Sequence, residues 1–73
     1  MVEESRPIDA LNIARGKRIL IRLKNGVEIS GTLKAHDLHL NMWLEDVEMS
    51  KGDEKTKLPG ILVRGDTVLY VIP

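Results

Sequence analysis

Alternating apolar and polar residues from residue 17 onward limit what this 73-residue chain can fold into. Ile19, Ile21 and Leu23 share one parity, and polar or basic residues take much of the other. A period of two is typical of a strand with one buried face. Asn25-Gly26 follows at once and is the strongest short signal for a hairpin turn. The pattern therefore predicts antiparallel strands over about 17–24 and 27–36.

The second of these strands is expected to bend. Val27, Ile29, Leu33 and Ala35 continue the inward row, and Gly31 falls in the same row. A glycine inside a strand often permits a sharp bend, which a small barrel needs where a long strand wraps around the core.

The rest of the chain predicts one helix and three more strands. The helix covers about 6–14, with Pro7 in its first turn, and Ile8, Leu11 and Ala14 form its apolar face. A third strand covers about 40–49, where Val47 breaks the alternation and suggests a bulge. The charged segment from Ser50 to Gly60 is interpreted as a solvated loop. The last strands cover about 61–64 and 67–72.

Those last strands are apolar on both faces, as in Ile61-Leu62-Val63 and Val68-Leu69-Tyr70-Val71-Ile72. A single domain of 73 residues cannot bury both faces, and an apolar edge strand invites pairing. We therefore expect copies to join edge to edge, and a repeated head-to-tail contact closes a ring. The predicted fold is all-β with a short N-terminal helix: one domain, 1–73, forming a strongly bent five-stranded antiparallel small barrel.

The composition disfavours two classes of protein, nonspecific duplex binders and membrane proteins. Eleven basic residues balance eleven acidic ones, which disfavours a nonspecific duplex binder that depends on surplus positive charge. The chain has no cysteine, and no apolar run approaches the roughly 20 residues of a membrane span. A cytoplasmic protein without a membrane segment or cofactor is expected.

Polar residues interrupt the alternation at two places. Asp37, His39 and Asn41 stand at every second position, and Arg64-Gly65-Asp66 separates the last two strands. An amide can read a base edge, an imidazole can stack, and a guanidinium suits a stacked base or a phosphate. The combination predicts a pocket for single-stranded nucleic acid.

The chain also resembles the Sm and Sm-like RNA-binding family. Its first motif is matched by Ile19 to Gly26, Gly31-Thr32-Leu33, Asp37 to Met42 and Leu44 to Glu48, and its second by Ile61 to Val68. The resemblance is greatest to the archaeal Sm-like proteins and implies a homo-oligomeric ring, of seven subunits rather than six. The bacterial relative Hfq typically carries a Tyr-Lys-His stretch where this chain has Val63-Arg64-Gly65-Asp66.

The resemblance implies a role for each site residue. His39 and Arg64 would sandwich a uracil near the inner rim of the ring, and Asn41 would hydrogen-bond the base edge. Asp66 would orient Asn41 or Arg64, Gly65 would offer a backbone N–H, and Asp37 would support the loop. Two positions depart from the family pattern: His36 stands where tyrosine is common, and Trp43 where a smaller aliphatic residue is usual.

Three other interpretations have less support. His36, Asp37 and His39 suggest a metal site, but two histidines three positions apart lack a clear third and fourth ligand. A catalytic serine lacks a histidine and carboxylate placed to activate it, so an enzyme is not expected. The main alternative is a structural or protein-interaction ring whose RNA pocket is vestigial. The favoured function is a ring that binds uridine-rich single-stranded RNA at its pore, as a scaffold or chaperone in RNA metabolism.

Overall fold

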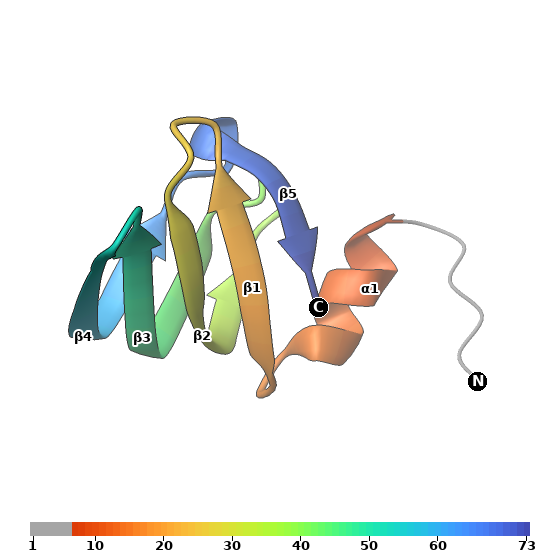
Figure 1. The fold of residues 1–73 in the computed structure, drawn as a ribbon. Helices are drawn as coiled ribbons and strands as arrows, with labels where there is room; N and C mark the ends of the chain where they lie inside the picture. The colour runs from red at the N-terminus through yellow and green to blue at the C-terminus, as the bar shows by residue number, and fades with distance from the viewer. Residues whose placement is uncertain (1–6) are drawn as a thin grey trace.

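A short helix followed by five antiparallel strands makes up the computed structural model, which describes residues 7–73 (Figure 1). The elements are α1 (Pro7–Ala14), β1 (Arg18–Leu23), β2 (Glu28–His36), β3 (Met42–Lys51), β4 (Glu54–Val63), the 3₁₀ turn η1 (Gly65–Thr67) and β5 (Val68–Ile72). The predicted fold class is confirmed. Within residues 7–73, no helix is long and apolar enough to cross a membrane.

The helix presents the predicted apolar face to the core. Leu11 and Ala14 are buried and Ile8 packs against the same cluster. Helix α1 ends before Gly16, whose φ of 83° lies in the left-handed region that favours glycine. The Gly16 N–H donates to the Leu33 carbonyl over 2.7 Å, which ties the helix end to β2. Arg6, in the predicted helix, lies outside the described residues.

The strands form one sheet in the order β4-β3-β2-β1-β5. The predicted Asn25-Gly26 turn joins β1 to β2, with Gly26 at φ 88° and the Asn25 side-chain oxygen accepting from the Val27 N–H over 3.1 Å. Because β4 and β5 lie at opposite ends of this order, they are the two edges of the sheet.

The predicted bend at Gly31 is confirmed as a β-bulge. Ser30 pairs with Glu48 and Thr32 with Glu45, so Asp46 and Val47 together face Gly31 alone. Asp46 has a φ of 53°, and a Cβ on Gly31 would come within 3.0 Å of the Val47 side chain. A glycine here lets the two strands approach closely where the sheet bends.

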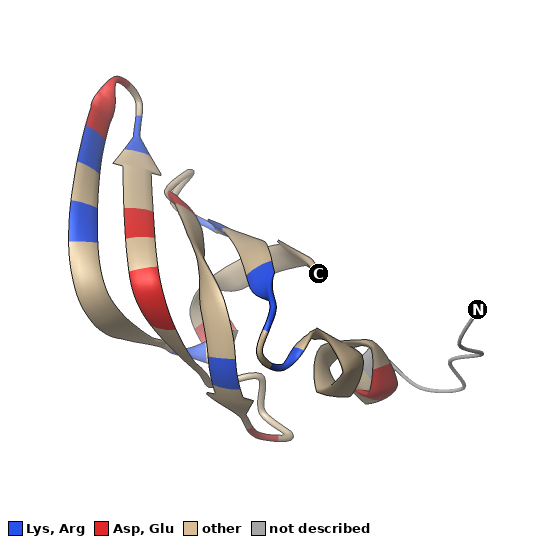
Figure 2. Ribbon diagram, turned by 90° about the horizontal axis from the view of Figure 1, so that it is seen from below, with Lys and Arg blue, Asp and Glu red and all other residues tan. Residues whose placement is uncertain are grey.

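The predicted loop over residues 50–60 is wrong. The third strand continues to Lys51, only Gly52 and Asp53 form the turn, and β4 begins at Glu54 rather than at residue 61. Figure 2 shows basic and acidic residues side by side along this long hairpin. Residues 51–57 are exposed, because this end of the hairpin extends past the core, and so their polar composition resembles that of a loop.

The predicted inward position of Ala35 is also wrong. Leu33 pairs with Leu44 and Ala35 pairs with Trp43, which leaves Lys34 as an extra residue in β2. One extra residue reverses the side-chain alternation of everything that follows it. Ala35 and Trp43 therefore lie on the outer, exposed face of the sheet.

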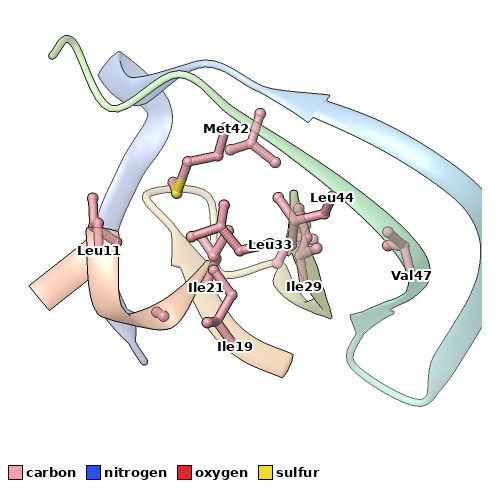
Figure 3. Close-up of a cluster of buried hydrophobic side chains, with 11 residues drawn as sticks. Leu11, Ile19, Ile21, Ile29, Leu33, Met42, Leu44 and Val47 are labelled. Atoms are coloured by element: carbon pink, nitrogen blue, oxygen red, sulfur yellow. The ribbon is translucent and has the colours of Figure 1, made fainter. Parts of the chain in front are cut away.

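The core lies inside the bent sheet and extends to the helix (Figure 3). Its most deeply buried side chains come from β1, β2 and β3, and they are Ile21, Ile29, Leu33, Met42 and Leu44. Met42 directly follows Asn41, so the end of the 37–41 loop is anchored in the core.

The two edge strands expose large apolar side chains. Leu62 on β4 is 64% exposed, and on β5 the exposed fractions are 60% for Leu69, 45% for Tyr70 and 51% for Ile72. In the described part of the chain, no strand pairs with the outer side of β4 or of β5. Each end of the sheet thus presents free backbone groups beside apolar side chains.

Candidate nucleic-acid interface

Two polar segments that are far apart in the sequence meet at one end of the sheet. The first is the loop Asp37–Asn41 between β2 and β3, and the second is Arg64 with the turn Gly65–Thr67 between β4 and β5. The Gly65 N–H donates to the Asn41 Oδ1 over 2.9 Å, a contact across 24 residues of sequence. The two predicted groups of polar residues therefore belong to one site.

Asp37 organises the first segment. Its Oδ1 accepts from the backbone N–H of His39 at 2.9 Å and of Asn41 at 3.0 Å. Its Oδ2 accepts from the Asn41 Nδ2 at 3.0 Å. Leu40, with a φ of 63°, lets the chain turn back within this short loop. A single carboxylate thus fixes both the backbone of the loop and the side chain of Asn41.

The partners of Asn41 determine how its amide is oriented. A backbone N–H can only donate and an ionised carboxylate can only accept, so Oδ1 faces Gly65 and Nδ2 faces Asp37. These bonds use one hydrogen of Nδ2 and one lone pair of Oδ1. Within residues 7–73, the second hydrogen and the second lone pair have no partner, so this fixed amide keeps one donor and one acceptor for a ligand.

Arg64 and Asp66 form an exposed ion pair, with 3.2 Å between Arg64 NH2 and Asp66 Oδ2. Their side chains are 75% and 64% exposed, so the pair adds little to stability, but it restricts where the guanidinium lies. Within residues 7–73, Asp66 bonds Arg64, whereas Asp37 and Gly65 hold Asn41.

Gly65 brings the two segments into backbone contact. A Cβ at this position would overlap the carbonyl oxygen of His39 and come within 2.9 Å of the Leu40 carbonyl carbon. The side chains of His39 and Arg64 are both exposed and extend from segments that Gly65 holds together. The N–H of Gly65 is already used by Asn41, so its role is to position that amide.

Thr67, which the sequence analysis does not single out, holds the second segment in its turn. Its hydroxyl donates to the Arg64 carbonyl over 2.7 Å, and its backbone N–H donates to the same oxygen over 3.1 Å. A threonine that closes a tight turn after glycine and aspartate was the available signal. No group of three or more metal-ligating side chains converges anywhere in residues 7–73.

The hydrogen bonds to Asp37 hold the pKa of its carboxyl below the ordinary value of 3.8. The largest cause is the Asn41 side chain, followed by the backbone N–H groups of Asn41 and His39, while burial opposes them. A folded-state pKa below the unfolded value means that the ionised form favours folding. This contribution is complete above the unfolded value and is lost as pH falls through the folded pKa.

We therefore expect the melting temperature to fall in acid partly through Asp37. Asp37→Asn should be less stable than the wild type at pH 7, because an amide cannot accept all three hydrogen bonds, and its melting temperature should depend less on pH below about 4. Thermal unfolding from pH 7 to pH 2 checks this, with Asp53→Asn in the exposed β3–β4 turn as the control. An equal fall in melting temperature below about pH 4 for Asp37→Asn and the wild type would contradict this expectation.

The chain is similar to known proteins of one family. The LSM domain family matches residues 9–73. An Sm-like relative from Archaeoglobus fulgidus is 41% identical over 69 residues, which cover 93% of this chain and 90% of the relative.

Two solved structures are similar over almost their whole length. The Sm protein of Pyrococcus abyssi, in complex with a uridine heptamer, is 38% identical with a TM-score of 0.88, covering 94% of this chain and 99% of that one. The SmAP1 heptamer of P. aerophilum is 32% identical with a TM-score of 0.89, covering 97% and 96%.

Proposed function

The chain belongs to the LSM domain family, and from this membership and the site geometry we propose that seven copies form a ring that binds uridine-rich single-stranded RNA at its pore. The observation that carries the proposal is the Asn41 amide, held by Asp37 and Gly65 with one donor and one acceptor free. Uracil presents a ring N–H flanked by carbonyl oxygens, so one amide can meet a donor and an acceptor together.

His39 and Arg64 supply the stacking surfaces in this proposal. Both are planar, exposed and adjacent to Asn41 through the Gly65 contact. Stacking of a base on a planar side chain contributes about 1–3 kcal/mol and tolerates any base. Discrimination for uracil then comes from the amide, and Asp66 restrains the guanidinium.

Ring formation follows in the proposal from the two free edges. An edge such as β4, with exposed Leu62, can pair with the β5 edge of the next copy, which exposes Leu69 and Ile72. Because the contact joins two different surfaces, it repeats head to tail until the ring closes. Adjacent copies then hold nucleotides of the same RNA, and each later contact is effectively intramolecular.

The proposed role is a binding one, as a scaffold or chaperone without catalysis. Its cytoplasmic location also remains a prediction.

We expect the native complex to have the mass of seven chains and to bind oligo-uridine at least about tenfold more tightly than oligo-adenosine at equal salt. Native mass spectrometry and fluorescence anisotropy measure these two quantities. Weak, equal binding of both RNAs that disappears with added salt would indicate general electrostatics and favour a protein-interaction ring. Cleaved RNA after long incubation would contradict the absence of catalysis.

A further inference from the structure

A depression lies on the outer face of the sheet, next to the site described above. Its volume is about 240 Å³, and its lining residues are Ala35, His36, Asp37, Asn41, Trp43 and Leu62. Ala35, Trp43 and Leu62 are directly paired across β2, β3 and β4, so they form one row on that face. The extra residue Lys34 is what turns Ala35 outward and opens this row.

Trp43 is an exposed aromatic side chain that is nevertheless held in place. Its Nε1–H donates to Glu45 Oε2 over 3.1 Å, and it is 41% exposed. The benzene carbons Cζ2 and Cη2, on the same side of the indole as Nε1, lie over Gly60, where a Cβ would come within 2.7 Å of both. A flat ring restrained by a hydrogen bond and by contact with Gly60 loses little freedom when another ring stacks on it.

The depression is continuous with the proposed uridine site. Asn41 and Asp37 line both, and Asn41 and Trp43 are two positions apart, a spacing of about 7 Å along one side of an extended chain. His36 adds a second observation. Within residues 7–73, both of its ring nitrogens are buried without a hydrogen-bond partner, which is uncommon in folded proteins.

We propose that this depression binds a second nucleobase of the RNA, the neighbour of the one held at Asn41, by stacking on Trp43. The inference rests on the proposed function and extends it from the pore onto the outer face of the sheet. The space of about 240 Å³ accommodates a base, and the indole accepts any base because each has a flat face. Glu45 places a negative charge at the far end of Trp43, which disfavours a phosphate there.

The test uses the fact that Trp43 is the only tryptophan of the chain. Titration of the native ring with a uridine heptamer should change the tryptophan fluorescence, and Trp43→Leu should lower the affinity for the heptamer about tenfold. Trp43→Phe, which keeps an aromatic face, should restore most of that affinity. Binding of uridine monophosphate, which occupies the Asn41 site alone, should be the same in Trp43→Leu and the wild type.

Each other outcome has a distinct meaning. If the heptamer binds in an Asn41-dependent manner while Trp43→Leu and the fluorescence are unaffected, the stacking site is wrong and the proposed function stands. If acrylamide fails to quench Trp43 in the free ring and Trp43→Leu breaks the ring in native mass spectrometry, a second copy covers the indole and the inference is overturned. If the wild type binds no uridine RNA, the proposed function itself fails.

Discussion

Asn41→Ala is expected to lower the affinity for oligo-uridine about 100-fold and to abolish the preference over oligo-adenosine, while the ring stays assembled. The substitution removes the donor and acceptor that would read uracil, which costs about 1–3 kcal/mol per base, and several sites act together on one RNA. Fluorescence anisotropy with both RNAs at fixed salt measures the effect. The edges β4 and β5 lie outside the altered contact, so native mass spectrometry should report an unchanged complex.

Asn41→Ala also removes a structural contact, and this must be separated from RNA binding. The Gly65 N–H loses its acceptor, and the loss of a partly buried hydrogen bond destabilises by about 1–3 kcal/mol. Binding should therefore be measured well below the melting temperature of the variant. Asn12→Ala, at an exposed position on α1, is the matched control and should leave both affinity and stability unchanged. Undiminished oligo-uridine binding by Asn41→Ala would remove Asn41 from the site.

Strands were predictable wherever one face of the sheet is buried. Ile19, Ile21 and Ile29 alternate with polar residues because the core lies on one side and water on the other. The first half of β4 carries no such signal, since residues 54–57 are exposed on both faces. Alternating hydrophobicity arises because one face of a strand is buried. A strand that extends beyond the core has no buried face, and so its sequence does not alternate.

A bulge limits prediction in a different way. The bend at Gly31 was predictable, because a glycine in the inward row of a strand is a known signal of a bend. Lys34 is an ordinary strand residue, and nothing in its type distinguishes an extra position from a paired one. The outward turn of Ala35, and with it the exposed row that includes Trp43, therefore required the structure.

The residues of the candidate site were predictable from the sequence, but only some of the hydrogen bonds between them were. Asp37 and Asn41 lie close in sequence, and their hydrogen bonds form within one loop. The contact between Asn41 and Gly65 joins loops that are 24 residues apart, and only the three-dimensional arrangement of β3 and β4 brings them together. The family resemblance implies that Asp66 orients Asn41 or Arg64, and the structure pairs it with Arg64.

Gly65→Ala is expected to destabilise the protein more than Gly52→Ala and to disrupt the candidate site. The added Cβ would overlap the His39 carbonyl oxygen, which belongs to backbone and cannot rotate away as a side chain can. The two segments must then separate, which breaks the Gly65–Asn41 hydrogen bond as well. Steric overlap in a packed region costs about 1–3 kcal/mol and the lost bond about 1 kcal/mol more.

A destabilisation of about 3 kcal/mol corresponds to a fall in melting temperature of roughly 12–24 °C for a domain of this size. Calorimetry at fixed protein concentration measures it, since assembly couples stability to concentration. Gly52→Ala is the matched control. Gly52 has open space around it and a φ of 59°, so the same methyl group should cost only about 1 kcal/mol through the backbone angle.

The comparison of these two alanine variants tests whether the loops are as close as the structure places them. If backbone angle alone mattered, Gly52→Ala would be the more damaging change, because only Gly52 of the pair has a positive φ. We expect the opposite order, together with loss of oligo-uridine binding in Gly65→Ala alone, since Asn41 and Arg64 can share one base only while Gly65 fits against His39. Equal stability of the two variants would mean that the loops are farther apart, and Asn41 would then lack the restraint on which the proposed uracil recognition depends.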